Sequence, residues 1–256
     1  AFISSHDLQE PLRKIMTFSS MMSGPEGNLN TYGKKYSDKI NASAFKLSSL
    51  LKSLLSFSTL INNHDNFTTV DLNDTLKNVL KDFEKMIVEK KAVINVPLLP
   101  VIQAEPIQMN QLFHNLISNA LKFNNGSPVI DIIAKKVTPE DSPIQQLLKQ
   151  DISYAAISVQ DNGIGFEEKY LDKIFNLFQR LTDKEYPEGT GIGLAICKKI
   201  LTNHMGFIFA KSKKNEGSTF TVFLPLTWPA AELPIVDKIL SVRLMDLANK
   251  RKQNKV

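Results

Sequence analysis

A histidine next to an aspartate lies near the start of the chain, in the segment Ser5-His6-Asp7-Leu8-Gln9-Glu10-Pro11. His6 falls one position off the apolar stripe of the helix expected there, so its imidazole should face solvent. A neutral ring nitrogen with a pKa near ~6.5 can act as a nucleophile, and Asp7, in a suitable rotamer, can fix the ring tautomer and accept its proton. Pro11 should bend the helix one turn later, because it offers no amide hydrogen to the carbonyl of Asp7. The alternative is a solvated surface histidine.

A second polar set has helical spacing. Asn115, Asn119 and Lys122 stand at positions i, i+4 and i+7, so they share one face of an expected helix whose other face is apolar. Amide oxygens are suitable ligands for Mg²⁺, and a lysine beside them can neutralise phosphate oxygens. An exposed polar helix face is the alternative.

Two glycine-containing segments can bring the backbone close to a ligand. In the first, Asp161-Asn162-Gly163-Ile164-Gly165, a carboxylate at the end of a strand can accept a hydrogen bond from an exocyclic amine, although a plain turn has the same composition. The second, Gly189-Thr190-Gly191-Ile192-Gly193, opens a helix whose free amides suit phosphate. Its spacing matches neither a Walker A loop nor the dinucleotide fingerprint. The polar segment 176–188 before it is typical of a mobile lid. Gly217-Ser218-Thr219-Phe220 opens the last strand.

The elements that must position these groups fall into two parts. In the first sixty residues, apolar residues recur at helical spacing on both sides of a break at 23–28. This pattern predicts a helical hairpin. Its apolar face is too wide for two helices to bury, so we expect a second copy to complete a four-helix bundle, which makes the protein a homodimer.

After residue 66 the pattern changes to alternating strands and helices. Strands are expected over 67–72, 92–96, 129–137, 152–160, 207–212 and 218–225, and helices over 73–89, 106–123 and 192–203. The chain is therefore predicted to be α+β, with helices stacked on one face of a sheet. Residues 138–151 form an insert of no assigned function. The predicted division is 1–64 for the hairpin, 65–228 for the α/β domain and 229–256 for an extension, expected to be an amphipathic helix.

Composition excludes several other classes. The chain has 256 residues with 31 basic and 26 acidic side chains, a net charge of +5, and no basic stripe that would indicate a nucleic-acid partner. Its single cysteine, Cys197, excludes an intrachain disulfide and is expected in the core. No apolar run reaches the roughly 20 residues that cross a bilayer. We therefore expect a cytoplasmic location and no membrane contact within this chain, with a sensor domain upstream of Ala1; whether the full-length protein also has a membrane anchor there is left open by the sequence.

In this order, the segments resemble the catalytic core of sensor histidine protein kinases of two-component systems, over about residues 1 to 226. The segment around His6 is similar to the phosphoacceptor box of the phytochrome-like and PAS-linked form. The later segments resemble the family's five nucleotide boxes, which are 115–123, 161–165, 174–178, 189–194 and 217–220. The resemblance implies a dimeric helical hairpin followed by an α/β sandwich with a mixed sheet, the Bergerat ATP-binding fold.

The resemblance also implies roles in phosphoryl transfer. His6 would receive the γ-phosphoryl group of ATP, with Asp7 as general base, while Lys122 and Arg180 would neutralise phosphate charge. The phosphoryl group would then pass to an aspartate on the receiver domain of a response regulator. Family members that also dephosphorylate the regulator usually carry Thr or Asn four residues after the phosphoacceptor histidine. This chain has Glu10 there, so weak phosphatase activity is expected.

For the nucleotide, the resemblance implies that Asn115 binds Mg²⁺, that Asn119 and Lys122 contact phosphates, and that Asp161 accepts from the adenine amine. Thr219 would assist through water. The other nucleotide-binding residues it implies are Phe123, Gly163 and Gly165 near the base, and Gly189, Gly191, Gly193 and Leu194 at the lid. Two alternatives remain: an ATP-hydrolysing motor-type ATPase of the gyrase, chaperone or mismatch-repair kind, and a pseudokinase that serves as a dimerisation scaffold.

Overall fold

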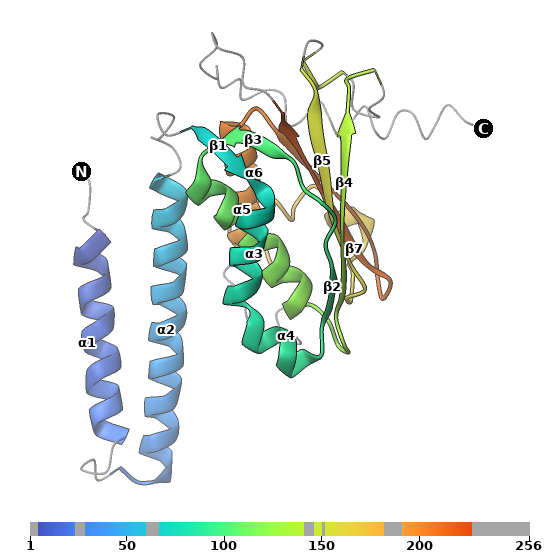
Figure 1. The fold of residues 1–256 in the computed structure, drawn as a ribbon. Helices are drawn as coiled ribbons and strands as arrows, with labels where there is room; N and C mark the ends of the chain where they lie inside the picture. Colours follow the sequence, from blue (N-terminus) through green and yellow to red (C-terminus); the bar gives the residue numbers. More distant parts are fainter. Residues whose placement is uncertain are drawn as a thin grey trace.

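A computed structural model of the chain describes residues 5–23, 29–59, 67–140, 146–149, 152–181 and 191–226. It begins with the antiparallel helices α1 (Ser5–Ser23) and α2 (Thr31–Thr59), which stand beside an α/β unit (Figure 1). The two helices approach closely where Ser19 and Ser37 face each other, because each hydroxyl donates to the backbone carbonyl of the other residue, at 3.0 and 2.6 Å. The expected helical hairpin is present.

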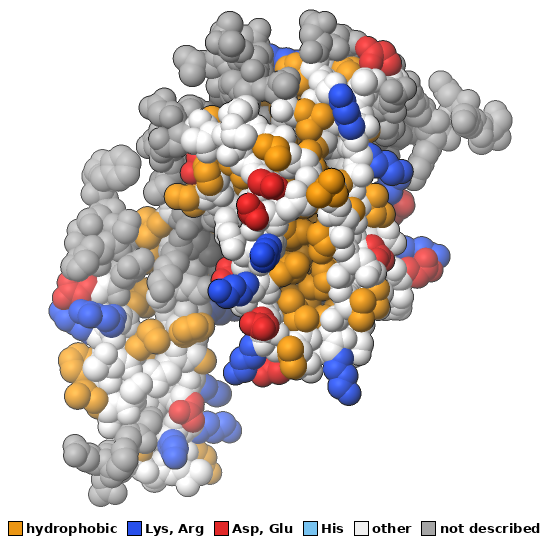
Figure 2. Space-filling model, viewed as in Figure 1, with side chains coloured by type: hydrophobic (Ala, Val, Ile, Leu, Met, Phe, Trp, Pro, Cys, Tyr) orange, Lys and Arg blue, Asp and Glu red, His pale blue; other side chains and the backbone are white. Residues whose placement is uncertain are grey.

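Much of the apolar surface of this hairpin is exposed. Leu12 and Ala44 are buried between the helices, whereas Phe18 on α1 and Tyr36 on α2 are 61% and 63% exposed. Figure 2 shows part of this hydrophobic surface over the hairpin. A large exposed apolar surface marks an interaction site. The exposed apolar face from which the four-helix bundle is predicted is therefore present in the structure. The pairing of two hairpins stays a prediction.

The α/β unit is built on a five-stranded mixed sheet with strand order β2-β4-β5-β7-β6. Its strands are β2 (Val93–Asn95), β4 (Val129–Val137), β5 (Tyr154–Asp161), β6 (Phe207–Lys213) and β7 (Gly217–Pro225). The β2–β4 pair is parallel, and the other pairs are antiparallel. A separate two-stranded sheet pairs β1 (Thr68–Asp71) with β3 (Val101–Ala104). The longest strands, β4, β5 and β7, thus lie in the middle of the sheet.

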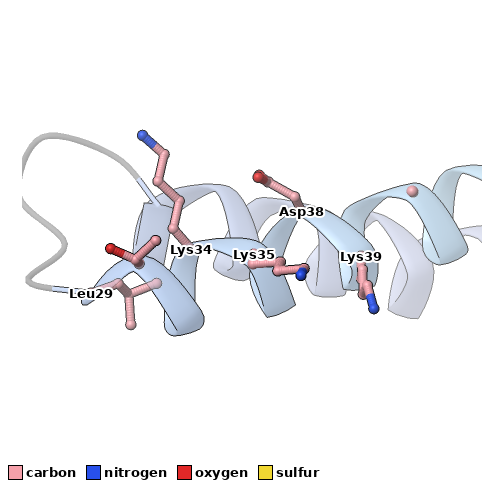
Figure 3. Close-up of a pocket in the computed structure, with 7 residues that line it drawn as sticks. Leu29, Lys34, Lys35, Asp38 and Lys39 are labelled. Carbon is pink, nitrogen blue, oxygen red and sulfur yellow. The ribbon is translucent and has the colours of Figure 1, made fainter.

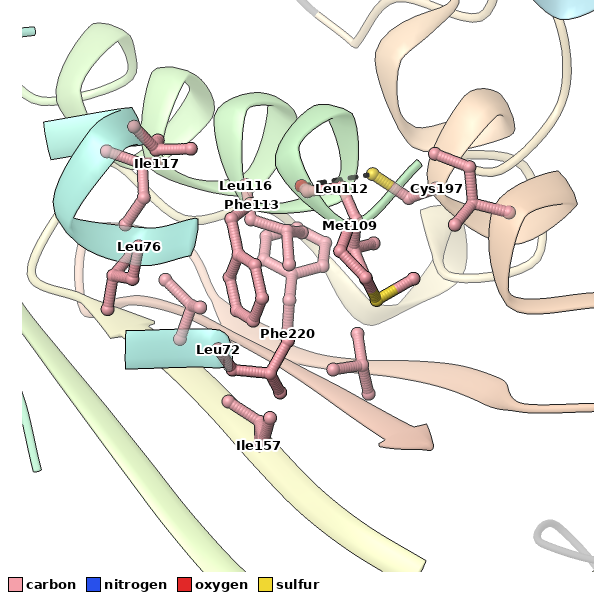
Figure 4. Packing of buried hydrophobic residues seen from close by; sticks show 14 of the residues in the cluster. Leu72, Leu76, Met109, Leu112, Phe113, Leu116, Ile117, Ile157, Cys197 and Phe220 are labelled. Carbon is pink, nitrogen blue, oxygen red and sulfur yellow. Dashed lines mark hydrogen bonds between the residues drawn. The ribbon is translucent and has the colours of Figure 1, made fainter. Parts of the chain in front are cut away.

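Helices α3 (Leu72–Asp82), α4 (Glu84–Lys90), α5 (Pro106–Lys122) and α6 (Gly193–Asn203) lie on one side of the sheet (Figure 1). Figure 4 shows the core between the layers, where Leu112, Phe113 and Leu116 of α5 meet Ile157 and Phe220 of the sheet. Alternate strand residues point into this layer, as the two-residue period of a half-buried strand requires. The expected α+β class and the helix-on-sheet sandwich are confirmed.

The start of α5 is fixed by its own sequence. Glu105 is the N-cap, and its carboxylate accepts hydrogen bonds from the amides of Ile107 and Gln108, at 3.3 and 2.7 Å. Pro106 occupies the first turn, where its missing amide hydrogen costs nothing. His204, which is buried, ties this cap to the end of α6, because its Nε2 accepts from the Glu105 amide at 3.1 Å. The polar ridge of α5 is therefore held in a fixed place.

The far face of the sheet carries a second, smaller cluster, made of Leu148, Ile152, Tyr154 and Phe223. Leu148 comes from the insert at 138–151, so this part of the insert covers the sheet face that the helices leave open. Residues 146–149 of the insert form a turn, and residues 141–145, 150 and 151 lie outside the described residues.

Two sequence expectations differ from the structure. The helix expected over 73–89 is divided at Phe83 into α3 and α4, and the four-residue strand β3 was not expected. The extension 229–256 lies outside the described ranges, so its helix and the division at 64 and 228 stay predictions. Within the described ranges, no helix combines the length and the apolar character that crossing a lipid bilayer requires.

Candidate active site

Asp161 is a buried carboxylate at the end of β5. It continues the inward row of Ile157 and Val159 and is only 9% exposed. Its Oδ1 accepts hydrogen bonds from the amides of Gly163 (2.8 Å) and Ser218 (3.3 Å). Burial raises the pKa of Asp161 to about 6, while the two amide hydrogen bonds oppose the rise. Its other oxygen, Oδ2, has no partner among the described residues, so it remains available to accept a hydrogen bond from a ligand.

The loop after Asp161 passes so close to neighbouring backbone that side chains are excluded. A Cβ added at Gly163 would lie 2.3 Å from the carbonyl oxygen of Phe123, and one at Gly165, where φ is +55°, would lie 2.0 Å from that of Lys213. The loop is held by hydrogen bonds from the Ile164 amide to the Phe123 carbonyl (3.0 Å) and from the Phe166 amide to Ser212 Oγ (2.8 Å). The glycines thus supply both space and conformation.

The ridge of Asn115, Asn119 and Lys122 is present on α5, as the spacing predicts. All three side chains are half-buried. The Nδ2 atom of Asn115 is buried and has no hydrogen-bond partner among the described residues. A buried amide without a partner is costly in a protein interior, so this side chain is suited to a polar ligand that the fold itself does not supply.

Helix α6 faces this ridge at Asn115. A Cβ added at Gly193, the first residue of α6, would lie 3.4 Å from Asn115 Oδ1. One turn later, the fully buried Cys197 lies over α5, and its thiol points to the Leu112 carbonyl at 3.9 Å (Figure 4). Burial raises the pKa of Cys197 to about 12. The thiol is therefore a neutral core group, as expected.

Lys122 gives the ridge its positive charge. No ion pair or hydrogen bond of its ammonium group occurs within the described part of the chain. Its charge acts on the neighbouring face of α5, where it adds to the burial that lowers the pKa of His114. The His114 ring is stacked on Phe83 with centroids 4.6 Å apart. An unpaired lysine beside an amide with an unsatisfied group favours binding of an anion.

The two ends of the predicted lid lie together. A Cβ added at Gly191 would lie 2.9 Å from the carbonyl oxygen of Gln179 and 3.1 Å from Cγ of Arg180. Arg180 is half-buried, and Leu194 packs against the core. Phe178, the last residue of the segment 174–178, is 55% exposed with φ +61°. The structure therefore brings Arg180 beside the start of α6, whereas Gly189 lies outside the described residues.

The sheet register corrects the place expected for Thr219. Thr219 is paired with Gln160, whereas Ser218 is paired with Asp161. Directly opposed residues in an antiparallel pair point to the same face, and the next residues point to the other face. Ser218, and not Thr219, therefore shares the face of the sheet on which Asp161 lies. The sequence analysis missed Ser218, although its place directly after Gly217 was a usable signal, and it gave no signal for Ser212.

The phosphoacceptor candidates can be placed only along the backbone. His6 and Asp7 lie in the first turn of α1, and their side chains lie outside the description. An open hollow at the start of α2 is lined by Lys34, Lys35, Asp38 and Lys39 among others (Figure 3). Their side chains project away from one another, and the hollow lies at the end of the hairpin remote from the α/β unit (Figure 1). It therefore does not belong to the site around Asp161.

Comparison with known proteins agrees with this architecture. Residues 104–227 match the family of histidine kinase-, DNA gyrase B- and HSP90-like ATPases. The phytochrome-like protein Cph1 of Synechocystis sp. is 33% identical over 228 residues, which are 88% of this chain and 29% of that protein. The chain thus spans less than a third of this curated relative.

Two solved structures share the fold. Full-length ShkA in complex with AMPPNP is 23% identical, with a TM-score of 0.63 over 90% of this chain and 46% of that one. Histidine kinase ThkA in complex with the response regulator protein TrrA is 24% identical, with a TM-score of 0.55 over 87% of this chain and 59% of that one. Residues 104–227 are therefore an ATPase domain of the histidine kinase-, DNA gyrase B- and HSP90-like family, and over most of its length the chain is similar to histidine kinases.

Proposed function

We propose that this chain transfers the γ-phosphoryl group of ATP to His6 and then to an aspartate on the receiver domain of a response regulator. The observation that carries the proposal is the convergence around one site of a free carboxylate oxygen, a glycine-containing loop, and an unpaired lysine on the same helix face as a buried amide. A histidine with an acidic neighbour stands in the hairpin of the same chain.

The Asp161 end of the site would bind the adenine base. Asp161 Oδ2 would accept from the exocyclic amine, and Ser218 is proposed to take the assisting role first expected of Thr219, because it lies on the same face. The planar base would lie along the Gly163–Gly165 loop, whose glycines let the loop pack against the carbonyls of Phe123 and Lys213 and so hold its place beside Asp161. An amine donor facing an acceptor-only carboxylate gives base selectivity, since a carbonyl there would leave both groups unpaired.

The α5 end would bind the phosphates. Asn119 and Lys122 would contact phosphate oxygens, and Arg180 and the Gly189–Gly193 segment would close over them. Mg²⁺ would be held through Oδ1 of Asn115, which faces the start of α6, while the unsatisfied Nδ2 of the same side chain suits a phosphate oxygen. The described residues contain no cluster of three acidic, histidine or cysteine side chains, so the ion would be held mainly by phosphates and water, as Mg²⁺ commonly is. When bound, Mg²⁺ supplies neutralisation of phosphate charge.

At the hairpin, a ring nitrogen of His6 would attack the γ-phosphorus, the bond to the β-phosphate would break, and ADP would leave. Asp7 would hold the ring tautomer and take the ring proton. Two hairpins would form a four-helix bundle through their exposed apolar faces, and the receiver domain would dock on this bundle. The ThkA–TrrA complex, whose kinase shares this fold, supports the choice of partner.

The test is incubation with γ-labelled ATP and Mg²⁺, with wild type and His6→Gln in parallel. Acid-labile, base-stable label on wild type alone is the expected result. Release of free phosphate that His6→Gln leaves unchanged would instead favour a motor-type ATPase. Nucleotide binding without label on either protein would favour a pseudokinase scaffold.

A further inference from the structure

Ser212, near the end of β6, joins three parts of the site. Its hydroxyl accepts from the Phe166 amide (2.8 Å), donates to the Gly217 carbonyl (2.9 Å), and lies 3.0 Å from Ser218 Oγ. Ser212 and Ser218 are directly opposed in the β6–β7 pair. Ser218 in turn donates its amide to Asp161 Oδ1. One hydroxyl therefore links the loop that begins at Gly163 with β6 and with β7, the strand that pairs with β5 at Asp161.

The number of hydroxyl hydrogens in this cluster determines which group donates each hydrogen bond. A serine hydroxyl has one hydrogen to donate and two lone pairs to accept with. The only hydrogen of Ser212 Oγ is used on Gly217, since a carbonyl oxygen can only accept. The contact between the two hydroxyls then requires that Ser218 donates to Ser212. Ser218 Oγ is thereby left with acceptor capacity alone, on the face of the sheet on which Asp161 lies.

We propose that Ser212 is a positioning residue that sets base specificity, because it orients Ser218 as an acceptor toward the exocyclic amine of adenine. The inference rests on the proposed function of the site. Asp161 supplies one acceptor by its charge, and Ser212 converts a hydroxyl that otherwise accepts or donates into a second acceptor. Without Ser212, the Ser218 hydrogen is free to turn toward the ligand.

The test compares Ser212→Ala with wild type in titrations of ADP and of purine riboside diphosphate, which lacks only the exocyclic amine. A general loosening of the loop weakens both nucleotides equally and cancels in the ratio of their dissociation constants. We expect Ser212→Ala to reduce the preference for ADP over the analogue by about fivefold, the usual effect of one neutral hydrogen bond. Ser212→Thr, which keeps the hydroxyl, is expected to retain the preference.

Ser158→Ala is the matched control. Its hydroxyl pairs with Thr221 at 2.8 Å between β5 and β7, but on the opposite face of the sheet. It is expected to leave the ratio unchanged. Ser218→Ala is a second, independent test. It should lower the preference for ADP over the analogue as much as Ser212→Ala does, and the double variant should show no further loss of this preference.

Equal losses for both nucleotides, or an unchanged ratio in Ser212→Ala and Ser218→Ala, would overturn the role of Ser212. If Ser212→Ala does not fold, an unchanged ratio in Ser218→Ala alone overturns it. Failure of the wild type to bind ADP would instead overturn the proposed function, and this inference with it.

Discussion

Gly163→Ala is expected to impair nucleotide binding by steric conflict. The added Cβ would lie 2.3 Å from the Phe123 carbonyl oxygen and 2.7 Å from Asp161 Oδ1, whereas ordinary contacts begin near 3.4 Å. Because the nearest atom belongs to the backbone, no rotamer change relieves the overlap, and the loop must move by about 1 Å. The movement lengthens and weakens two hydrogen bonds, from the Gly163 amide to Asp161 Oδ1 and from the Ile164 amide to the Phe123 carbonyl.

Each of these bonds contributes about 1 kcal/mol to the stability of the fold. ADP binds the loop in its original position, in which the added Cβ overlaps the backbone, and such overpacking costs about 2 kcal/mol. A cost of about 2 kcal/mol corresponds to a rise of about thirtyfold in the dissociation constant of ADP. Isothermal titration of ADP measures it, and thermal unfolding shows whether the fold is retained.

Gly126→Ala is the control, since its Cβ would meet only the Asn124 side chain at 3.8 Å. It should bind ADP as the wild type does. Binding by Gly163→Ala within threefold of wild type would refute the steric argument and, with it, the position of the base against this loop.

Three further predictions concern the charged and polar groups of the site. Burial raises the pKa of Asp161 to about 6, and the adenine amine binds the ionised carboxylate, so protonation of Asp161 competes with ADP binding. The affinity for ADP should be constant above about pH 7 and fall as the pH drops below 6. Asp161→Asn should bind ADP weakly and show no such fall. A wild-type affinity that does not change between pH 5 and pH 8 would contradict this. Asn115→Ala should reduce the gain in ATP affinity that Mg²⁺ produces, while ATP binding without Mg²⁺ should stay within about threefold of wild type. Titrations of ATP with and without the ion measure both. Equal losses of affinity in the two titrations would contradict the role of Asn115 as a metal ligand. Glu10, ion-paired with Lys14 at 2.7 Å, should repel a phosphoaspartate, so the phosphorylated regulator should decay at the same rate with and without this protein, and strong acceleration by the wild type would contradict the expectation.

The sequence predicted the parts of the site that depend on local spacing. The i, i+4, i+7 pattern placed Asn115, Asn119 and Lys122 on one helix, because helical periodicity is a property of the segment itself. The glycines after Asp161 were expected to allow positive φ and close approach. The structure shows close approach to neighbouring backbone at both glycines and a positive φ at Gly165. Long, strongly periodic elements such as α5 and β4 were predicted nearly to the residue.

What the sequence did not predict depends on contacts between distant segments. Strand β3 has four residues and exists through its pairing with β1, which no local pattern records. The break at Phe83 was hidden because apolar residues continue in helical register through it. The choice between Ser218 and Thr219 depends on strand register, since a shift of one residue moves every side chain to the other face. The link through Ser212 needs the same register and the path of the loop after Asp161.

The most direct test of the account is to locate the phosphoryl group among the four histidines of the chain, His6, His64, His114 and His204. The protein is incubated with ATP and Mg²⁺, digested at alkaline pH, and its peptides are sequenced by tandem mass spectrometry with a fragmentation method that preserves phosphohistidine. We expect one phosphoryl group, on His6, and we expect it to be absent or strongly reduced in Lys122→Ala. A phosphoryl group on another histidine, or ATP consumption with His6 unmodified, would contradict the central claim.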